Sequence, residues 1–153
     1  MDEKLQIISI TNPVAIGTFA PLLVKFLEIT KIPGMVYENL YSYFALTVHN
    51  KNAEVCVVLD NTKPVGFGLW YVKGLPYAGL ACCDFVYSHN RKRGIFKLLA
   101  DKFIEFGKEH RCPYYECTAV NETVSTVLEK MATKLGLNVK RLDNVTMFGW
   151  RDK

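Results

Sequence analysis

The segment Gly79 to Tyr87 constrains the fold of this chain more than any other. It has the sequence GLACCDFVY, in which Asp84 is the only charged residue. Side chains alternate between the two faces of a sheet, so a strand this apolar must be covered on both faces. The segment therefore predicts a central strand at about residues 77–87, with other elements packed above and below it. A chain of 153 residues can build such a core within one domain.

The rest of the sequence alternates between strand patterns and helical patterns. We expect strands at 5–10, 53–60, 65–72, 77–87, 114–120, 138–142 and 145–150, and helices at 14–29, 36–46, 94–109 and 122–135. The stretches at 138–142 and 145–150 are either two strands or one bent ribbon. This order, β, α, α, β, β, β, α, β, α, β, β, predicts an α/β (α+β) mixed sheet with helices packed against it. No linker or repeat interrupts it, so residues 1–153 are expected to form a single domain.

Composition narrows the classes of function. The five cysteines have no C-x-x-C spacing, which is typical of reduced thiols in the cytosol. A zinc site at Cys112, Cys117 and His110 is the weaker alternative, because no second ligand pair has metal spacing, and we expect no metal. The acidic start and the short apolar runs predict a soluble protein without a secretory signal or membrane span. The formal net charge of +4 is mild and locally clustered, which favours a small anionic ligand over nucleic acid.

The basic cluster lies where the central strand gives way to an amphipathic helix. Arg91, Lys92 and Arg93 are followed by Gly94, and the helical pattern begins there. The first N–H groups of a helix have no intrahelical acceptor, and the helix dipole adds partial positive charge, so a phosphate group fits this position. Glycine permits close approach of the backbone. The alternative is that the three cations only solvate an ordinary loop.

Three stretches carry a resemblance to a known family. Residues 91–96, RKRGIF, are similar to a pyrophosphate loop of the form Q/R-x-x-G-x-G/A, Asn121 follows the next strand, and residues 134–137, KLGL, resemble a K-L-G-F helix ending. Together with the order of strands and helices, they resemble the GNAT acetyltransferase superfamily along most of the chain, most strongly over residues 54–150.

The resemblance implies a GNAT-like fold, with a central, mostly antiparallel sheet splayed in the middle and helices on both faces. It implies acetyl-CoA as co-substrate, held by main-chain groups of the central strand and by the loop that follows it. The implied cofactor-binding residues are Phe85, Val86, Arg91, Lys92, Arg93, Gly94, Ile95, Phe96 and Asn121. Main-chain groups near Asp84 and Val86 would pair with the pantetheine arm and polarise the thioester carbonyl.

The sequence departs from the family pattern at two positions. Phe96 stands where the family has Gly or Ala, and Ala132 stands where it has the tyrosine that acts as general acid, with Leu128 competing for that place. The remaining candidates for a catalytic acid or base are Asp84, Glu116 and Tyr115, with Tyr114 as an alternative to Tyr115. Each has a structural alternative, since Asp84 and Glu116 can be paired carboxylates and the tyrosines can fill the core.

The expected function is acetyl-CoA-dependent transfer of an acetyl group to an amine of a small molecule or protein, by direct attack and in the cytoplasm. Aromatic residues of the early helices and the terminal strands are expected to line an acceptor groove, or alternatively to pack in the core: Tyr37, Tyr41, Tyr43, Trp70 and Trp150. The rival hypothesis is a GNAT-fold module without turnover that serves as a structural or binding component. A homodimer and a place in a larger assembly both stay open.

Overall fold

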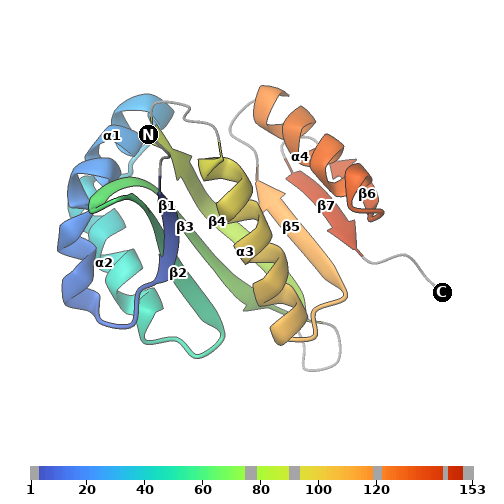
Figure 1. Ribbon diagram of the computed structural model, residues 1–153, viewed down its shortest axis with the longest axis horizontal. Helices are drawn as coiled ribbons and strands as arrows, with labels where there is room; N and C mark the ends of the chain where they lie inside the picture. Colours follow the sequence, from blue (N-terminus) through green and yellow to red (C-terminus); the bar gives the residue numbers. More distant parts are fainter. Residues whose placement is uncertain (1–3, 75–78, 90–93, 119–121, 143–144, 150–153) are drawn as a thin grey trace. The chain divides into compact units, whose positions relative to one another are not determined.

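The computed structural model describes residues 4–74, 79–89, 94–118, 122–142 and 145–149, and it confirms the predicted order of elements (Figure 1). The elements are β1 (Leu5–Ser9), the 3₁₀ helix η1 (Pro13–Thr18), α1 (Ala20–Thr30), α2 (Tyr37–Val48), β2 (Ala53–Asp60), β3 (Lys63–Lys73), β4 (Leu80–Ser88), α3 (Ile95–Glu109), β5 (Tyr114–Thr118), α4 (Glu122–Lys134), β6 (Asn138–Leu142) and β7 (Val145–Gly149). The helix predicted at 14–29 is two elements, and α1 starts with Pro21 in its first turn, where a missing N–H costs no helical hydrogen bond.

The strands are hydrogen-bonded in the order β1-β2-β3-β4-β5-β7-β6. The pairs β1–β2, β5–β7 and β6–β7 are antiparallel, and β4–β5 is parallel. The chain divides into two compact units, one of residues 1–70 and 85–102 and the other of residues 71–84 and 103–153. Strands β3 and β4 and helix α3 contribute residues to both units.

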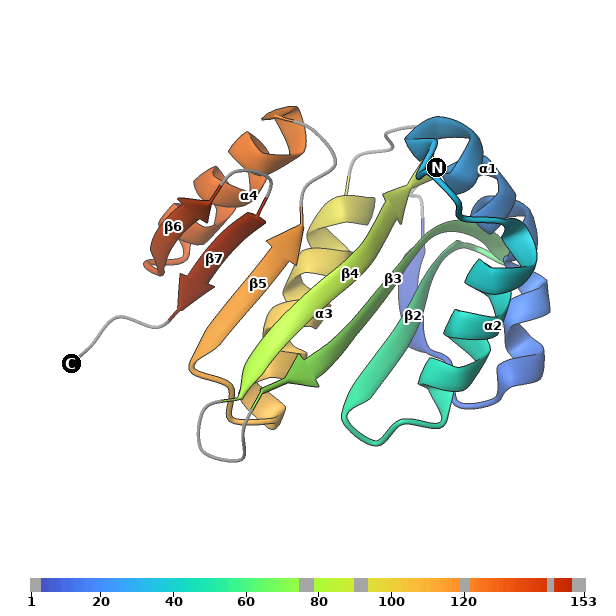
Figure 2. The same ribbon diagram turned by 180° about the vertical axis from the view of Figure 1, so that it is seen from behind.

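The core of the first unit is built on alternate residues of β3. Phe67 is fully buried, and its ring lies 5.9 Å from Phe19, 5.7 Å from Phe26 and 5.4 Å from Phe44, centroid to centroid. The neighbouring Gly66 faces the start of α3 instead. Helices α1 and α2 therefore cover one face of this part of the sheet, and α3 covers the other (Figures 1 and 2). The predicted mixed sheet with helices on both faces is confirmed.

A half-buried carboxylate is hydrogen-bonded to two neighbouring strands of the first unit. Glu54 on β2 accepts a hydrogen bond of 2.8 Å from Ser9 Oγ on β1 and one of 3.0 Å from Trp70 Nε1 on β3. Hydrogen bonds to an ionised acceptor are stronger than neutral ones, so the carboxylate stabilises the packing of these strands.

In the second unit β5 lies between β4 and β7, and α4 packs along β6 and β7 (Figure 1). Helix α4 ends at Gly136, which has a φ of +77°. There the Leu137 N–H donates to the Ala132 carbonyl at 3.0 Å, which is a typical helix ending around a left-handed glycine. The helix ending that residues 134–137 resemble in sequence is therefore confirmed.

No helix within the described ranges combines the length and the apolar character that crossing a membrane requires.

Candidate functional site

The last residues of β4 are fixed by aromatic packing within the first unit. The Phe85 ring lies 5.6 Å from Phe26, 5.7 Å from Phe44 and 5.9 Å from Tyr43, centroid to centroid. Tyr87, two residues on, lies 5.5 Å from Phe67 by the same measure. Aromatic pairs at these distances each contribute about 0.5–1.5 kcal/mol beyond simple burial. The side chains therefore hold this segment of main chain in place.

The start of α3 is held just as closely. Ile95 is fully buried, and a Cβ on Gly66 would lie 2.7 Å from Ile95 Cγ2 and 2.8 Å from the carbonyl oxygen of Tyr87. The absence of a side chain at Gly66 thus allows the helix start to approach both β3 and the end of β4. This contact fixes the first turn of α3 relative to the strand that precedes it.

Gly94 makes the turn into the helix. Its φ of +94° lies in a region that residues with a Cβ rarely adopt, and the residue is exposed. The Leu98 N–H donates to the Gly94 carbonyl at 3.0 Å, so the helical hydrogen bonds begin at Leu98. The N–H groups before it have no acceptor within the helix, which makes this turn a suitable site for an anion.

The residues predicted to hold the cofactor fall into two groups. Phe85, Val86 and Phe96 are half-buried, Ile95 is buried and Gly94 is exposed, all beside the strand end or the first turn of α3. The remaining predicted residues, Arg91, Lys92, Arg93 and Asn121, lie outside the described residues. The described part fits a pyrophosphate group through the positive φ of Gly94 and the open helix start.

In the second unit the parallel ladder between β4 and β5 pairs residues 80–83 with residues 114–117. Its last pair is Cys83 with Cys117, while β4 itself continues to Ser88. The first part of β4 is therefore used for sheet pairing. The sheet is predicted to splay at the residues of β4 that follow this ladder.

Asp84 and Tyr87 on β4 have different partners on β3. In the second unit Asp84 is hydrogen-bonded to Tyr71, and in the first unit Tyr87 packs on Phe67.

Four polar side chains form a cluster within the second unit: Tyr71, Cys82, Asp84 and Glu116. Cys82 is paired in register with Glu116, and Asp84 is two residues further along β4. Burial, followed by the neighbouring Asp84, Cys82 and Glu116 and the Asp84 hydrogen bond, raises the pKa of Tyr71 to about 12. Burial, followed by Glu116, raises the pKa of Cys82 to about 11. Both groups are therefore neutral near pH 7.

Sequence reasoning had selected Asp84 and Glu116 and had missed Tyr71. The structure brings the two carboxylates into the same cluster and gives Asp84 a hydrogen-bond partner in Tyr71, while its catalytic role stays a prediction. Alternation from the apolar Phe67 places Tyr71 on the same face, which is a signal present in the sequence. The register of β3 against β4, which brings Tyr71 to Asp84, is not.

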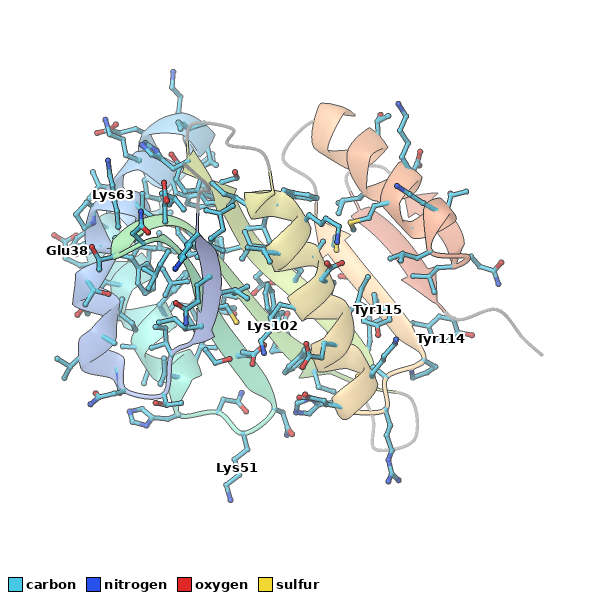
Figure 3. The ribbon with its side chains drawn as sticks, viewed as in Figure 1. Glu38, Lys51, Lys63, Lys102, Tyr114 and Tyr115 are labelled. Carbon is cyan, nitrogen blue, oxygen red and sulfur yellow. The ribbon has the colours of Figure 1, made fainter. Side chains whose placement is uncertain are left out.

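Tyr115 lies apart from this cluster, on the α3 side of β5. It is fully buried, its hydroxyl donates to the Ile104 carbonyl at 2.8 Å, and its ring packs 5.4 Å from Phe103. A Cβ on Gly107 would lie 2.1 Å from this ring, so the helix has a glycine where the tyrosine crosses it. Its neighbour Tyr114 is 55% exposed (Figure 3). Tyr115 is thus a core residue, and Asp84 and Glu116 are the remaining candidates for an acid or base.

The position of the missing tyrosine is also buried. Ala132 has no exposed surface and Leu128 is 7% exposed, both on α4. Neither side chain carries a proton that could be transferred at neutral pH.

Of the aromatic residues predicted to line an acceptor groove, Trp70 is a core residue. It is fully buried and its indole N–H is used by Glu54, because even-numbered residues of β3 face α3. The rings of Tyr37 and Tyr41 pack against each other with their centroids 5.9 Å apart, and Tyr43 is 37% exposed. These three residues are therefore only partly buried. Trp150 lies outside the described residues.

Comparison with known proteins agrees with this geometry at the level of the fold. No protein-family model matches the sequence, and no curated protein matches it. Solved structures do match. The ribosomal-protein-alanine N-acetyltransferase of Brucella melitensis biovar Abortus has a TM-score of 0.64 at 21% identity, covering 83% of this chain and 89% of its own. A GNAT-family acetyltransferase from Streptococcus pneumoniae has a TM-score of 0.67 at 12% identity, covering 95% and 98%.

A third match was solved with a ligand. The aminoglycoside N-acetyltransferase AAC(6′)-Iy, in complex with the bisubstrate analogue CoA-S-monomethyl-acetylneamine, has a TM-score of 0.68 at 14% identity, covering 98% of this chain and 99% of its own. The chain has the GNAT acetyltransferase fold. The resemblance stated from the sequence is confirmed at that level, and the GNAT-fold neighbours include one that binds a CoA derivative.

No group of three or more His, Cys, Asp or Glu side chains within the described ranges is arranged to hold a metal ion. All five cysteines are buried thiols outside any disulfide, as predicted from their spacing.

Proposed function

We propose that this chain is an acetyl-CoA-dependent N-acetyltransferase that acts on an amine of a small molecule or protein. The observation that carries the proposal is the open first turn of α3 after the left-handed Gly94, at the end of β4, in a chain with the GNAT fold. A turn of this kind binds an anionic group through its backbone N–H donors. In acetyl-CoA that group is the pyrophosphate.

The main chain of this region supplies the proposed cofactor contacts. The N–H groups from Lys92 to Phe96 bind the pyrophosphate, and Arg91, Lys92 and Arg93 add positive charge. Backbone groups near Phe85 and Val86 pair with the pantetheine arm, and Asn121 contacts that arm from the following loop. Because these contacts are mostly to backbone, they tolerate Phe96 in place of a smaller residue.

Asp84 and Glu116 are the proposed acid–base residues. An amine acceptor arrives as its ammonium ion and gives one proton to a carboxylate of this pair, from which the proton passes to solvent. The amine nitrogen then forms a bond to the thioester carbonyl carbon, and the bond from that carbon to sulfur breaks. The second nitrogen proton is lost after the C–N bond forms, and water returns a proton to the leaving thiolate. Ala132 stands at the usual tyrosine position and has no proton to give, so water makes this last transfer in place of a side chain.

The thiol of Cys82 supports direct attack over a covalent acetyl-cysteine. The thiolate is the nucleophilic form of cysteine, and with a pKa raised to about 11 by burial and by Glu116 the thiol stays protonated near neutral pH. A Cys82→Ala variant is accordingly expected to keep its transferase activity. The reduced state of all five cysteines agrees with the cytoplasm as the place of reaction.

Calorimetric titration with acetyl-CoA tests the proposal, using a pair of matched glycine variants. Gly94→Ala and Gly136→Ala both force an alanine into a positive φ, +94° and +77°, so they impose similar backbone strain. Gly94→Ala is expected to weaken acetyl-CoA binding about tenfold or more, because it distorts the anion-binding turn, while Gly136→Ala leaves binding unchanged. Equal affinity in both variants would contradict the assigned cofactor site.

A thiol-release assay across a panel of primary amines then tests turnover. Release of CoA that depends on the amine supports the transferase. Binding of acetyl-CoA without turnover would favour a GNAT-fold module that serves as a binding component, and no binding by the wild-type protein would remove both.

A further inference from the structure

The polar cluster in the second unit contains a residue to which the reaction described above gives no role. Tyr71 on β3 is half-buried, and its hydroxyl is hydrogen-bonded to Asp84. Glu116 lies next to this pair, since it is in register with Cys82, two residues before Asp84 on β4. One hydroxyl therefore lies beside two carboxylates and is bonded to one of them.

We propose that Tyr71 is a positioning residue for acetyl transfer: its hydroxyl donates a hydrogen bond to Asp84 and so orients that carboxylate to take the proton from the acceptor ammonium. This inference rests on the proposed function. It distinguishes the two carboxylates, with Asp84 the oriented proton acceptor and Glu116 a second negative charge that favours a cationic amine.

The hydroxyl of Tyr71 keeps its proton near neutral pH. Burial and the neighbouring Asp84, Cys82 and Glu116 all disfavour the phenolate, so the hydroxyl does not act as a base and has its proton to donate to Asp84. Cys82 is also hydrogen-bonded to Tyr71, and its neutral thiol can donate to the phenol oxygen. Among the described residues, the titratable groups around Asp84 are Tyr71, Lys73, Cys82 and Glu116.

The hydrogen bond from Tyr71 should affect the pH dependence of kcat/KM, which packing of the ring alone would not. A hydrogen bond donated to a carboxylate favours its charged form. Replacing Tyr71 by phenylalanine keeps the ring and removes the donor. The acidic limb of kcat/KM should then move upward by about one pH unit, which is a tenfold loss of activity below the limb. The KM for acetyl-CoA should stay unchanged, because Tyr71 is not among the proposed cofactor contacts.

The test compares Tyr71→Phe with Tyr114→Phe, the same substitution at a residue of β5 that is 55% exposed. The pH profile of kcat/KM is measured for the wild type and both variants with the amine that gives the fastest thiol release. A carbon-13 NMR titration of the Asp84 carboxyl group in each protein supplies a second readout that does not depend on turnover. We expect both midpoints to rise in Tyr71→Phe and neither to move in Tyr114→Phe.

The reciprocal measurement uses Asp84→Asn. Because Asp84 raises the pKa of Tyr71, the phenol should titrate at lower pH in this variant, as followed by its ultraviolet absorbance. The inference is overturned if the wild type transfers acetyl groups while the pH profile and carboxyl titration of Tyr71→Phe superimpose on those of the wild type. If the wild type binds no acetyl-CoA, the proposed function fails and the inference fails with it. A lower melting temperature in Tyr71→Phe without a shift of either midpoint assigns Tyr71 a purely structural role and also overturns it.

Discussion

Gly66 lies where β3 comes so close to the start of α3 that no side chain has room. A Cβ there would lie 2.7 Å from Ile95 Cγ2 and 2.8 Å from a backbone carbonyl that cannot move away cheaply. Gly66→Ala is therefore expected to lower the free energy of unfolding by about 1–3 kcal/mol, measured by urea denaturation. Gly17→Ala is the matched control, since its Cβ would meet nothing closer than 3.9 Å. Equal stability of the two variants would contradict the close approach of α3 to β3.

Tyr115 allows a test of whether a tyrosine at this position is structural or catalytic. Its buried hydroxyl donates to the Ile104 carbonyl at 2.8 Å. Tyr115→Phe is expected to lower the free energy of unfolding by about 1 kcal/mol through loss of this bond. At a temperature where the variant is fully folded, its kcat in the thiol-release assay should match that of the wild type. A large fall in kcat without a change in stability would return Tyr115 to the catalytic residues.

The residues of the candidate site differ in how far the sequence could predict them. Asp84 stands out as a charge in an apolar strand, and Gly94 stands out beside three cations, so composition alone selects both. Trp70 was expected in a pocket as an alternative to the core, and strand alternation places it in the core. Tyr71 was missed because its neighbour Asp84 comes from another strand. Which residues of two strands face each other depends on register, and register is set by the packing of the whole sheet.

At the scale of elements the sequence was more informative. Periodicity predicted the order of all strands and helices, because an apolar face must repeat every two residues in a strand and every three to four in a helix. The turn from η1 into α1 was not predicted, although Pro21 marks where an α-helix can start.

Glu54 joins three elements, and its removal should weaken all of them together. Its carboxylate accepts from Ser9 on β1 and from the buried Trp70 on β3. Glu54→Leu leaves the indole N–H without this acceptor and is expected to lower the free energy of unfolding by about 1–3 kcal/mol. Glu54→Gln keeps an amide oxygen that can accept one of the two bonds and should cost less. Urea denaturation ranks the three proteins, and a glutamine variant as unstable as the leucine variant would show that charge, not hydrogen bonding, is what matters.

At the scale of the whole molecule the folded chain resists loss of protons from three of its thiols and two of its phenols. Burial is the largest cause that raises the pKa of Cys56, Tyr71, Cys82, Tyr87 and Cys112, spread over both units. In the unfolded chain the cysteines lose their protons near pH 9.0 and the tyrosines near pH 10.0. Above pH 9 the unfolded state therefore binds fewer protons than the folded state, and this difference determines how stability changes with pH.

The stabilisation from these groups is complete below pH 9 and is lost as the pH rises toward the folded pKa values, about 11 for Cys82 and about 12 for Tyr71. The free energy of unfolding should accordingly fall between pH 8.5 and 10, with each such group contributing up to about 1.4 kcal/mol per pH unit. Urea denaturation across this range measures the slope. In Cys82→Ala the slope should be shallower, because one of the groups that titrates differently in the two states is gone. Stability that stays level or rises above pH 9 would mean that water reaches these side chains in the folded protein and that they ionise there as readily as in the unfolded chain.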